Sequence, residues 1–187
     1  MATGFVRPAR REDVGEIARI QLATWRIAYE RLMPRHVLAQ ISEDFLSQRW
    51  SEAVTSPPDP RHRVLVAVEQ SKQDYVVGFT ASEPLDGVAS MIELLVEPRW
   101  GRRGHGSRLL AASVDLWRAD GFTEAVMWAF EQDAAMTKFL TSAGWAPDGS
   151  YRELDVDDML VPQIRWHVSL TSEELPQSDG QAGPLDH

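Results

Sequence analysis

The sequence predicts a single α+β domain, and two patterns of apolar residues indicate this class. Residues 14–30 repeat apolar side chains at helical spacing, whereas residues 64–68 and 75–80 are short β-branched runs next to polar segments. The predicted elements follow the order β-α-α-β-β-β-α-β-α-β-β, which is not the strict alternation of an α/β protein. The 187 residues and a hydrophobic fraction of 43% suit one folded domain.

The first third of the chain predicts one edge strand and two helical regions, at residues 5–6, 14–30 and 34–50. Glu12 and Asp13 open the first helix, where acidic side chains interact favourably with the positive end of the helix dipole. Pro34 starts the second helical region, whose apolar residues share one face. The prolines in residues 56–60 exclude both helix and central strand, so this segment is predicted to be a loop.

The rest of the chain predicts further strands and two helices. The strands are expected at residues 64–68, 75–80, 91–96, 124–130, 151–154 and 164–170, and the helices at 104–119 and 134–142. Asp133 is a favourable N-cap for the second helix, and Gly121 and Gly144 are expected to end the two helices. The domain is expected to span residues 1–170, and the polar residues 171–187 are expected to form a disordered tail.

The composition argues against several classes of function. The absence of cysteine removes disulfides and thiolate catalysis, and no two histidines have the spacing of a helical metal site, so we expect no metal. A net charge of −9 argues against nucleic-acid binding and weakly favours cationic ligands. No apolar stretch approaches the roughly 18 residues of a membrane span, so we expect no membrane partner and a cytoplasmic location. The sequence does not fix the oligomeric state, and a homodimer stays open.

The most informative segment is a Gly- and Arg-rich turn that leads from the strand ending at residue 96 directly into a helix. Unpaired N–H groups at a helix start attract anions, Gly104 and Gly106 allow close approach of the backbone, and Arg102 and Arg103 add positive charge. The turn therefore predicts a phosphate or pyrophosphate ligand, with a tight turn of solvated arginines as the alternative. Its G-x-x-G-x-G spacing is not the dinucleotide fingerprint, and the G-K-[ST] of a P-loop is absent.

Several patterns then agree in order and spacing with one family. They are Val96-Glu97-Pro98 followed by Gly101-x-x-Gly104-x-Gly106, Asp133-x-x-Met136-x-x-Phe139-Leu140-x-x-x-Gly144-Trp145, Arg7-Pro8-Ala9 before Asp13, and Val77-Gly78-Phe79. In these features the chain resembles the GCN5-related N-acetyltransferase (GNAT) superfamily over about residues 4–170.

The resemblance implies a GNAT-type α/β/α sandwich with a mixed, splayed, mostly antiparallel central sheet that opens between strands 91–96 and 124–130. It also implies acetyl-CoA as co-substrate, with the pantetheine arm along the first of these strands and the pyrophosphate on the amides of the turn. The residues implied to bind acetyl-CoA are Leu94, Leu95, Val96, Arg102, Arg103, Gly104, His105, Gly106, Ser107, Asp133 and Leu140.

Three positions depart from the family pattern. Gly101 stands where the family has Gln or Arg, so Arg102 or Arg103 is expected to replace a phosphate contact. Asp133 replaces the usual Asn and brings an acid near the arm of acetyl-CoA. Leu140 replaces the Tyr that usually protonates the leaving thiolate, so the usual general acid is missing.

The resemblance implies transfer of an acetyl group to a primary amine of a small molecule or peptide, by direct attack. Glu93, on the strand beside the implied thioester, is the candidate base, with an ordinary exposed carboxylate as the alternative and Glu83 as the reserve. The family often carries its acid earlier on this strand, where this chain has Ser90. Tyr151 is the candidate acid. Trp25 and Tyr29, one helical turn apart, are the candidate substrate-binding pair, with core packing as the alternative. A non-catalytic module that binds acyl-CoA is the alternative function.

Overall fold

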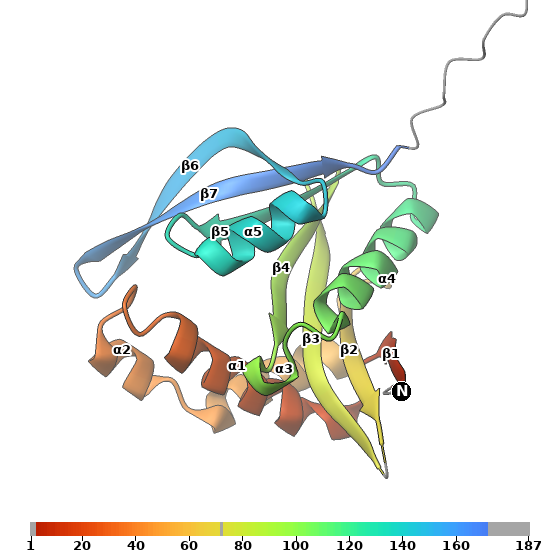
Figure 1. The fold of residues 1–187 in the computed structure, drawn as a ribbon, viewed down its shortest axis with the longest axis horizontal. Coiled ribbons are helices and arrows are strands. Elements are labelled where there is room, and N and C mark those ends of the chain that lie inside the picture. Colours follow the sequence, from red (N-terminus) through yellow and green to blue (C-terminus); the bar gives the residue numbers. More distant parts are fainter. Residues whose placement is uncertain (1–2, 72, 172–187) are drawn as a thin grey trace, which may run out of the picture.

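The computed structural model describes residues 3–71 and 73–171, which form one seven-stranded sheet flanked by helices (Figure 1). The sheet order is β1-β2-β3-β4-β5-β7-β6. The strands are β1 (Thr3–Pro8), β2 (Arg63–Gln70), β3 (Asp74–Leu85), β4 (Val88–Val96), β5 (Glu124–Phe130), β6 (Ala146–Val156) and β7 (Met159–Ser169). Neighbouring strands are antiparallel except for β4 and β5, so the sheet is mixed and mostly antiparallel, as expected.

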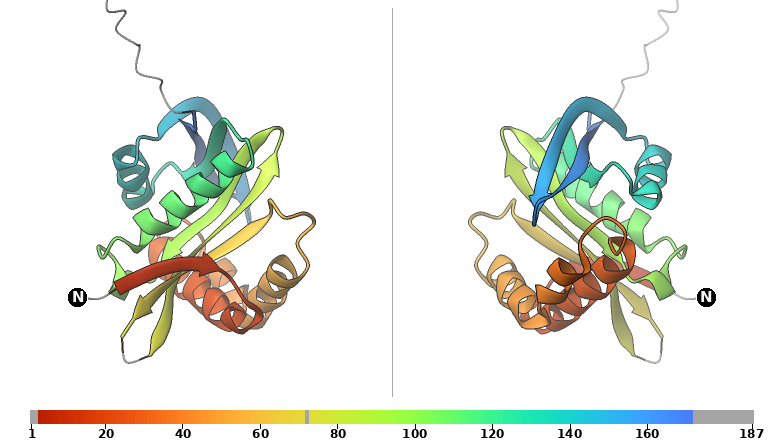
Figure 2. Two further views of the ribbon diagram at one scale, coloured as in Figure 1. Left: turned by 90° about the vertical axis from the view of Figure 1, so that its right-hand side faces the viewer. Right: turned by 90° about the vertical axis from the view of Figure 1, so that its left-hand side faces the viewer.

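Helices cover both faces of this sheet (Figure 2). The helices are α1 (Val14–Ala28), α2 (Arg35–Gln40), α3 (Glu43–Thr55), α4 (His105–Ala119) and α5 (Ala134–Ser142). On one face, Ile17 of α1 and Trp50 of α3 pack against Phe79 of β3. On the other face, Leu109 of α4 and Leu140 of α5 belong to the larger core cluster with residues of β4 and β5. This arrangement confirms the α/β/α sandwich.

The sheet opens at its centre, between the only parallel pair of strands in the described part of the chain. β4 and β5 are paired at Ala89–Met91 and Ala125–Met127, after which the register ends. The C-terminal half of β4 therefore keeps β3 as a neighbour and has no strand on its other side. This divergence confirms the predicted splay and exposes backbone groups of β4 to the gap.

One helical region and several strands differ from the expected elements; β6 and β7, for example, begin five residues earlier than expected. The helical region expected at 34–50 is divided into α2 and α3, because Ile41 and Ser42 adopt extended backbone and the Ser42 hydroxyl accepts a hydrogen bond from the Phe45 N–H at 3.1 Å. Such an N-cap satisfies one otherwise free amide and starts a new helix. β3 and β4 are also longer than expected and meet in a tight turn at Asp86 and Gly87, both with positive φ.

The tail expected at 171–187 lies outside the described residues apart from Thr171. In the described ranges no helix is long and apolar enough to cross a membrane.

Candidate active site

The Gly- and Arg-rich turn forms one wall of a cavity of about 450 Å³ beside the open part of the sheet. Arg102 and Gly104 have φ values of 62° and 80°, in the left-handed region, and this reverses the chain just before α4 begins at His105. The amides at the start of a helix have no partner within it, so they are available to an anion. Of the residues predicted to bind acetyl-CoA, the cavity is lined by Leu94, Leu95, Val96, Arg102, Gly104, His105, Gly106, Ser107 and Asp133.

The opposite wall of this cavity is the unpaired edge of β4. The Glu97 N–H donates to the Val77 carbonyl of β3 at 2.8 Å. Because backbone groups alternate in direction along a strand, those of Val96 point the other way, into the gap. An extended amide-bearing ligand can pair with this edge as an additional strand would. The edge thus fits the amide-bearing pantetheine arm that the family resemblance implied.

Arg103 has a different place from the one predicted. It does not line the cavity; its Nη1 lies 3.5 Å from Glu69 Oε1, and its guanidinium lies 4.8 Å from the centre of the Trp100 ring. His105 is 2% exposed, and its Nε2 lies 2.8 Å from Glu69 Oε2 without hydrogen-bond alignment. Burial lowers the pKa of His105 despite the nearby carboxylate. These contacts attach the turn to Glu69 of β2. Of Arg102 and Arg103, Arg102 therefore lines the cavity and Arg103 does not.

A second cavity, of about 230 Å³, adjoins the first one between α1, β4, β5 and α5. Tyr29, Asp133 and Met136 line both cavities, so these side chains form the boundary between them. Trp25 and Glu93 line the second cavity only. Glu93 of β4 therefore lines the same cavity as Trp25 and Tyr29, although these candidates were predicted from separate parts of the sequence.

Glu93 has the surroundings of a general base. It is half-buried on the cavity wall, and the Gln21 side chain donates to its carboxylate at 3.2 Å, while the Trp50 indole N–H donates to Gln21 at 2.7 Å. Burial raises the pKa of Glu93 to about 7, and the hydrogen bond from Gln21 opposes this shift. A carboxylate with a pKa near neutrality can accept a proton and release it again at physiological pH.

Tyr29 lies between Glu93 and the first cavity and is almost completely buried. Its ring makes an edge contact with Phe130 at 4.8 Å between centroids and a tilted contact with Trp25 at 6.1 Å. Burial, with the charges of Glu93 and Asp133, raises the pKa of the Tyr29 phenol. In the described residues its hydroxyl forms no hydrogen bond, so it is a neutral donor available to a ligand in either cavity.

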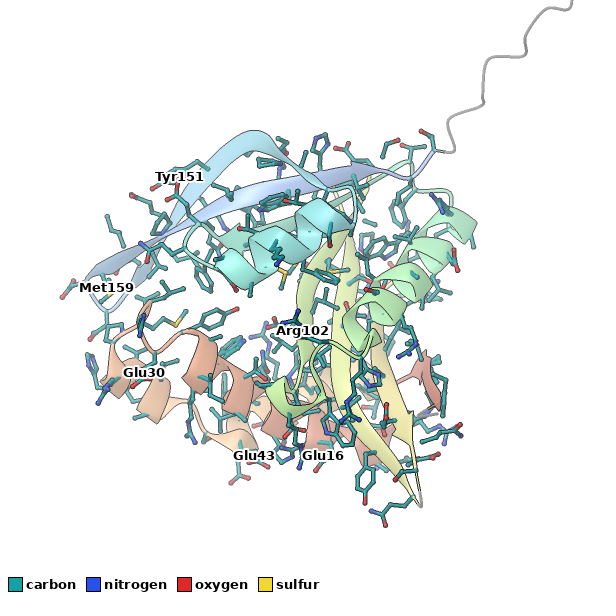
Figure 3. The ribbon with its side chains drawn as sticks, viewed as in Figure 1. Glu16, Glu30, Glu43, Arg102, Tyr151 and Met159 are labelled. Atoms are coloured by element: carbon teal, nitrogen blue, oxygen red, sulfur yellow. The ribbon has the colours of Figure 1, made fainter. Side chains whose placement is uncertain are left out.

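Besides Arg103 and Glu83, the predicted site residues Tyr151 and Leu140 line neither cavity. Tyr151 is 55% exposed on β6, where its hydroxyl donates to Glu153 at 2.9 Å, and Figure 3 shows it on the outer ribbon of β6 and β7, distant from Arg102. Leu140 has no exposed surface and packs in the core cluster. The acid role of Tyr151 stays a prediction that its position does not favour. Leu140 faces the core, so it has no direct contact with the cavity for acetyl-CoA.

Some cavity residues were not found from the sequence. Thr24 and Ala28 of α1, and Trp100 beside the turn, line the first cavity. Trp128 and Gln163 line the second cavity. Thr24 and Ala28 could have been predicted from the sequence. They are small, they are four residues apart, and this spacing puts them on one face of the helix, next to Trp25 and Tyr29.

The first cavity has the kinds of group that acetyl-CoA requires, namely a helix start for phosphates and an unpaired strand edge for amides. In the described residues no group of three or more His, Cys, Asp or Glu side chains could hold a metal ion.

Comparison with known proteins gives one consistent result. Residues 16–145 match the Acetyltransferase (GNAT) family. The chain is 28% identical over 138 residues to the uncharacterized N-acetyltransferase YuaI of Bacillus subtilis (strain 168), covering 70% of this chain and 74% of that protein. Among solved structures, PaiA N-acetyltransferase from Thermoplasma acidophilum in complex with coenzyme A superposes with a TM-score of 0.67 at 13% identity, covering 87% of this chain and 98% of that one. For yncA from Salmonella typhimurium with its cofactor acetyl-CoA, the TM-score is 0.66 at 17% identity, and the coverage is 94% and 99%.

Proposed function

We propose, from the premise that this chain belongs to the acetyltransferase (GNAT) family, that it transfers an acetyl group from acetyl-CoA directly to a primary amine of a small molecule or peptide. The observation that carries this proposal is the place of Glu93. Its carboxylate, with a pKa of about 7, lines a cavity that adjoins the cavity of the phosphate-binding turn. A base beside an acyl donor is the arrangement that amine acetylation requires.

Acetyl-CoA supplies an activated thioester when it is bound. The chain contributes phosphate contacts from Arg102 and the amides of Gly104–Ser107, and strand-like pairing from Leu94 and Val96. These contacts hold one end of the ligand and let the other reach Tyr29 and Asp133, where the two cavities meet. Positioning of this kind lowers the barrier because it converts a bimolecular reaction into one between oriented groups.

Glu93 removes a proton from the attacking amine. An alkylamine with a reference pKa near 10.4 is almost entirely protonated at neutral pH, so it cannot attack until it loses that proton. The hydrogen bond from Gln21 orients the Glu93 carboxylate, and Gln21 is itself held by Trp50. Trp25 and Tyr29 enclose the amine, and their ring faces suit an alkylammonium group before it loses its proton.

We assign Tyr29 as the donor for the departing sulfur, because, of the two cavities, Thr24 and Ser107 line only the first. Tyr29 lines both cavities, whereas Leu140 occupies the core and Tyr151 bonds to Glu153 on the outer strand. Because its pKa is raised, Tyr29 acts as a hydrogen-bond donor toward the thiolate. Full proton transfer is less necessary for this leaving group, since a thiol has a reference pKa near 8.5.

The proposal is tested by measuring CoA release from acetyl-CoA with a panel of primary amines that carry positive, neutral and negative groups. We expect turnover with at least one amine, and identification of the acetylated product by mass spectrometry. Acetyl-CoA binding in calorimetry without turnover of any amine would instead support a non-catalytic acyl-CoA-binding module.

A further inference from the structure

Next to the outer end of the second cavity lies Arg152, an exposed arginine that is not itself a lining residue and that the proposed chemistry does not use. In the sheet register, Phe130 of β5 lies opposite Gln163 of β7, and Gln163 lies opposite Arg152 of β6. Residues opposite one another project from the same sheet face, so the three side chains form one row. Phe130 and Gln163 line the cavity, which puts Arg152 at its rim.

The guanidinium of Arg152 is held in place at this rim. Its Nε donates to Gln163 Oε1 at 2.7 Å, and its Cζ lies 4.3 Å from the centre of the Trp128 ring. Both partners line the cavity. The hydrogen bond to Gln163 involves Nε, and the ring of Trp128 lies against the guanidinium. The terminal nitrogens Nη1 and Nη2 therefore stay available as donors, and these two contacts limit their position.

These donors have no acid to bind. In residues 3–71 and 73–171, Arg152 forms no salt bridge, and burial without a carboxylate partner lowers its pKa. The contrast is Arg165, which also lies near Trp128, at 5.9 Å, but bonds to Asp148 at 2.5 Å. Gln163 is 7% exposed, and its Nε2 also makes no hydrogen bond among the described residues. A carboxylate is the group that one amide N–H and two guanidinium N–H donors accommodate.

The cavity thus has two ends of opposite charge. Glu93 and Asp133 lie at the end next to the acetyl-CoA cavity, and Arg152 lies at the outer rim. A purely cationic amine would meet Arg152 as a like charge, and a peptide N-terminus would bring an uncharged amide to it.

We propose that the acetyl acceptor is a small zwitterion of the amino-acid class, whose amine faces Glu93 and whose carboxylate binds Arg152 and Gln163. This inference rests on the proposed acetyltransferase function. Acetylation forms the N–C bond and breaks the C–S bond, the amine proton passes to Glu93, and the thiolate leaves as CoA. Arg152 takes no part in these bond changes and selects the acceptor by its charge.

The test compares amino acids with their carboxamides, using L-methionine, L-phenylalanine and L-glutamate and the α-carboxamide of each. The two members of a pair have nearly the same size and differ in the charge of one group. Amidation lowers the pKa of the amine toward that of a peptide N-terminus, about 7.7–8.0, so basicity alone would favour the carboxamide. We expect kcat/KM for at least one acid to exceed that of its carboxamide by about tenfold or more, the scale of a charge-assisted contact.

The variant Arg152→Gln should reduce this acid-to-carboxamide ratio to near one, and Arg152→Lys should retain part of it. Arg165→Gln is the matched control, because it removes a guanidinium beside the same Trp128 ring that is already paired with Asp148, and its ratio should stay at the wild-type value. A wild-type ratio near one, or a preference that survives in Arg152→Gln, would overturn the inference while the acetyltransferase function stands. If no amine of any charge reacts, both proposals fail.

Discussion

At the scale of single residues, Glu93 links activity and stability through its raised pKa. A base must be unprotonated, so kcat/KM should rise with pH up to about 7 and then level off. Glu93→Gln should lower kcat by about 10²- to 10⁴-fold and remove this limb of the pH profile. Glu83→Gln is the control, since Glu83 lines a different cavity and should leave the profile unchanged. A profile that is the same in Glu93→Gln as in the wild type would rule out Glu93 as the base.

Glu93→Gln should also be more stable than the wild type above neutral pH. The pKa of Glu93 is raised from 4.5 to about 7 in the folded chain, so the folded state binds more protons than the unfolded state between these values. Stability is therefore lost as the pH rises through this window. Glu93→Gln should melt above the wild type at pH 8, and the difference should disappear near pH 4.

Tyr29 gives a second prediction at this scale. Tyr29→Phe should lower kcat about tenfold, less than the 10² or more typical of a general acid, because a thiolate leaves readily. The loss should not vary with pH across the neutral range, since the raised pKa keeps Tyr29 protonated. Tyr151→Phe should have little effect, because Tyr151 lies on the exposed side of β6. A large loss of kcat in Tyr151→Phe, together with wild-type kcat in Tyr29→Phe, would show that Tyr151 and not Tyr29 is the donor to the leaving thiolate.

Sequence reasoning named Glu93 as the candidate base and Tyr29, with Trp25, as a candidate substrate-binding residue, but it gave no indication of the donor role toward sulfur that we propose for Tyr29. Glu93 could be selected because its distance along the strand from the phosphate-binding turn is fixed by sequence. The place of Tyr29 at the boundary of two cavities depends on how α1 crosses the sheet, which the helical pattern does not specify. Arg152 was missed for the same reason, since its contact with Trp128 requires the β5-β7-β6 order.

At the scale of elements, the burial of Leu140 changes what a family-like substitution on α5 should do. The side chain has no exposed surface and packs in the core cluster, so a phenol at this position would enter a filled interior. Leu140→Tyr should destabilise the fold by about 1–3 kcal/mol, a decrease in Tm of several degrees for a chain of this size, and should not raise kcat. Leu140→Met, which conserves volume, should stay close to the wild type in thermal melting. Higher turnover with unchanged Tm in Leu140→Tyr would show that the ring reaches the cavity.

The elements themselves were largely predictable, and the exceptions have local causes. The strands and the helices α4 and α5 follow from apolar periodicity with Gly and Asp at their ends. The division between α2 and α3 was missed because the apolar residues Ile41, Phe45 and Leu46 keep helical spacing across it, whereas the capping hydrogen bond of Ser42 sets the boundary. The Val77-Gly78-Phe79 pattern has a steric basis in the structure, since a Cβ on Gly78 would lie 2.6 Å from the Leu95 carbonyl oxygen of β4.

At the scale of the whole molecule, the splayed sheet leads us to expect that bound acetyl-CoA stabilises the fold by linking the two halves of the sheet. The gap separates β4, which is held by β3, from β5, which is held by β7. A ligand in the first cavity would contact α1, β4 and α4 on one side and α5 on the other. The family resemblance predicted which strands diverge, but the residues that meet across the gap depend on the sheet order.

This arrangement predicts that acetyl-CoA raises the Tm considerably, and that a single substitution in the turn abolishes this increase. At about 100 times its dissociation constant, acetyl-CoA should stabilise the fold by about 2.7 kcal/mol, which corresponds to roughly 5–10 °C in Tm for a chain of this size. Gly104→Glu should abolish the shift, because it puts a carboxylate at the amides that would bind the pyrophosphate. Any side chain at Gly104 is also strained, since its φ is 80°.

Gly87→Glu is the control that separates strain from binding. Gly87 has a φ of 85° in the turn between β3 and β4, with open space around its Cα, so glutamate there adds similar strain and the same charge away from the cavity. Both variants should melt below the wild type without ligand, and Gly87→Glu alone should keep the shift with acetyl-CoA. If Gly104→Glu keeps it as well, the pyrophosphate binds elsewhere. Loss of the shift in both variants would mean that strain in a distant turn spreads to the cavity, and that the two halves of the sheet are coupled more tightly than their short β4–β5 register implies.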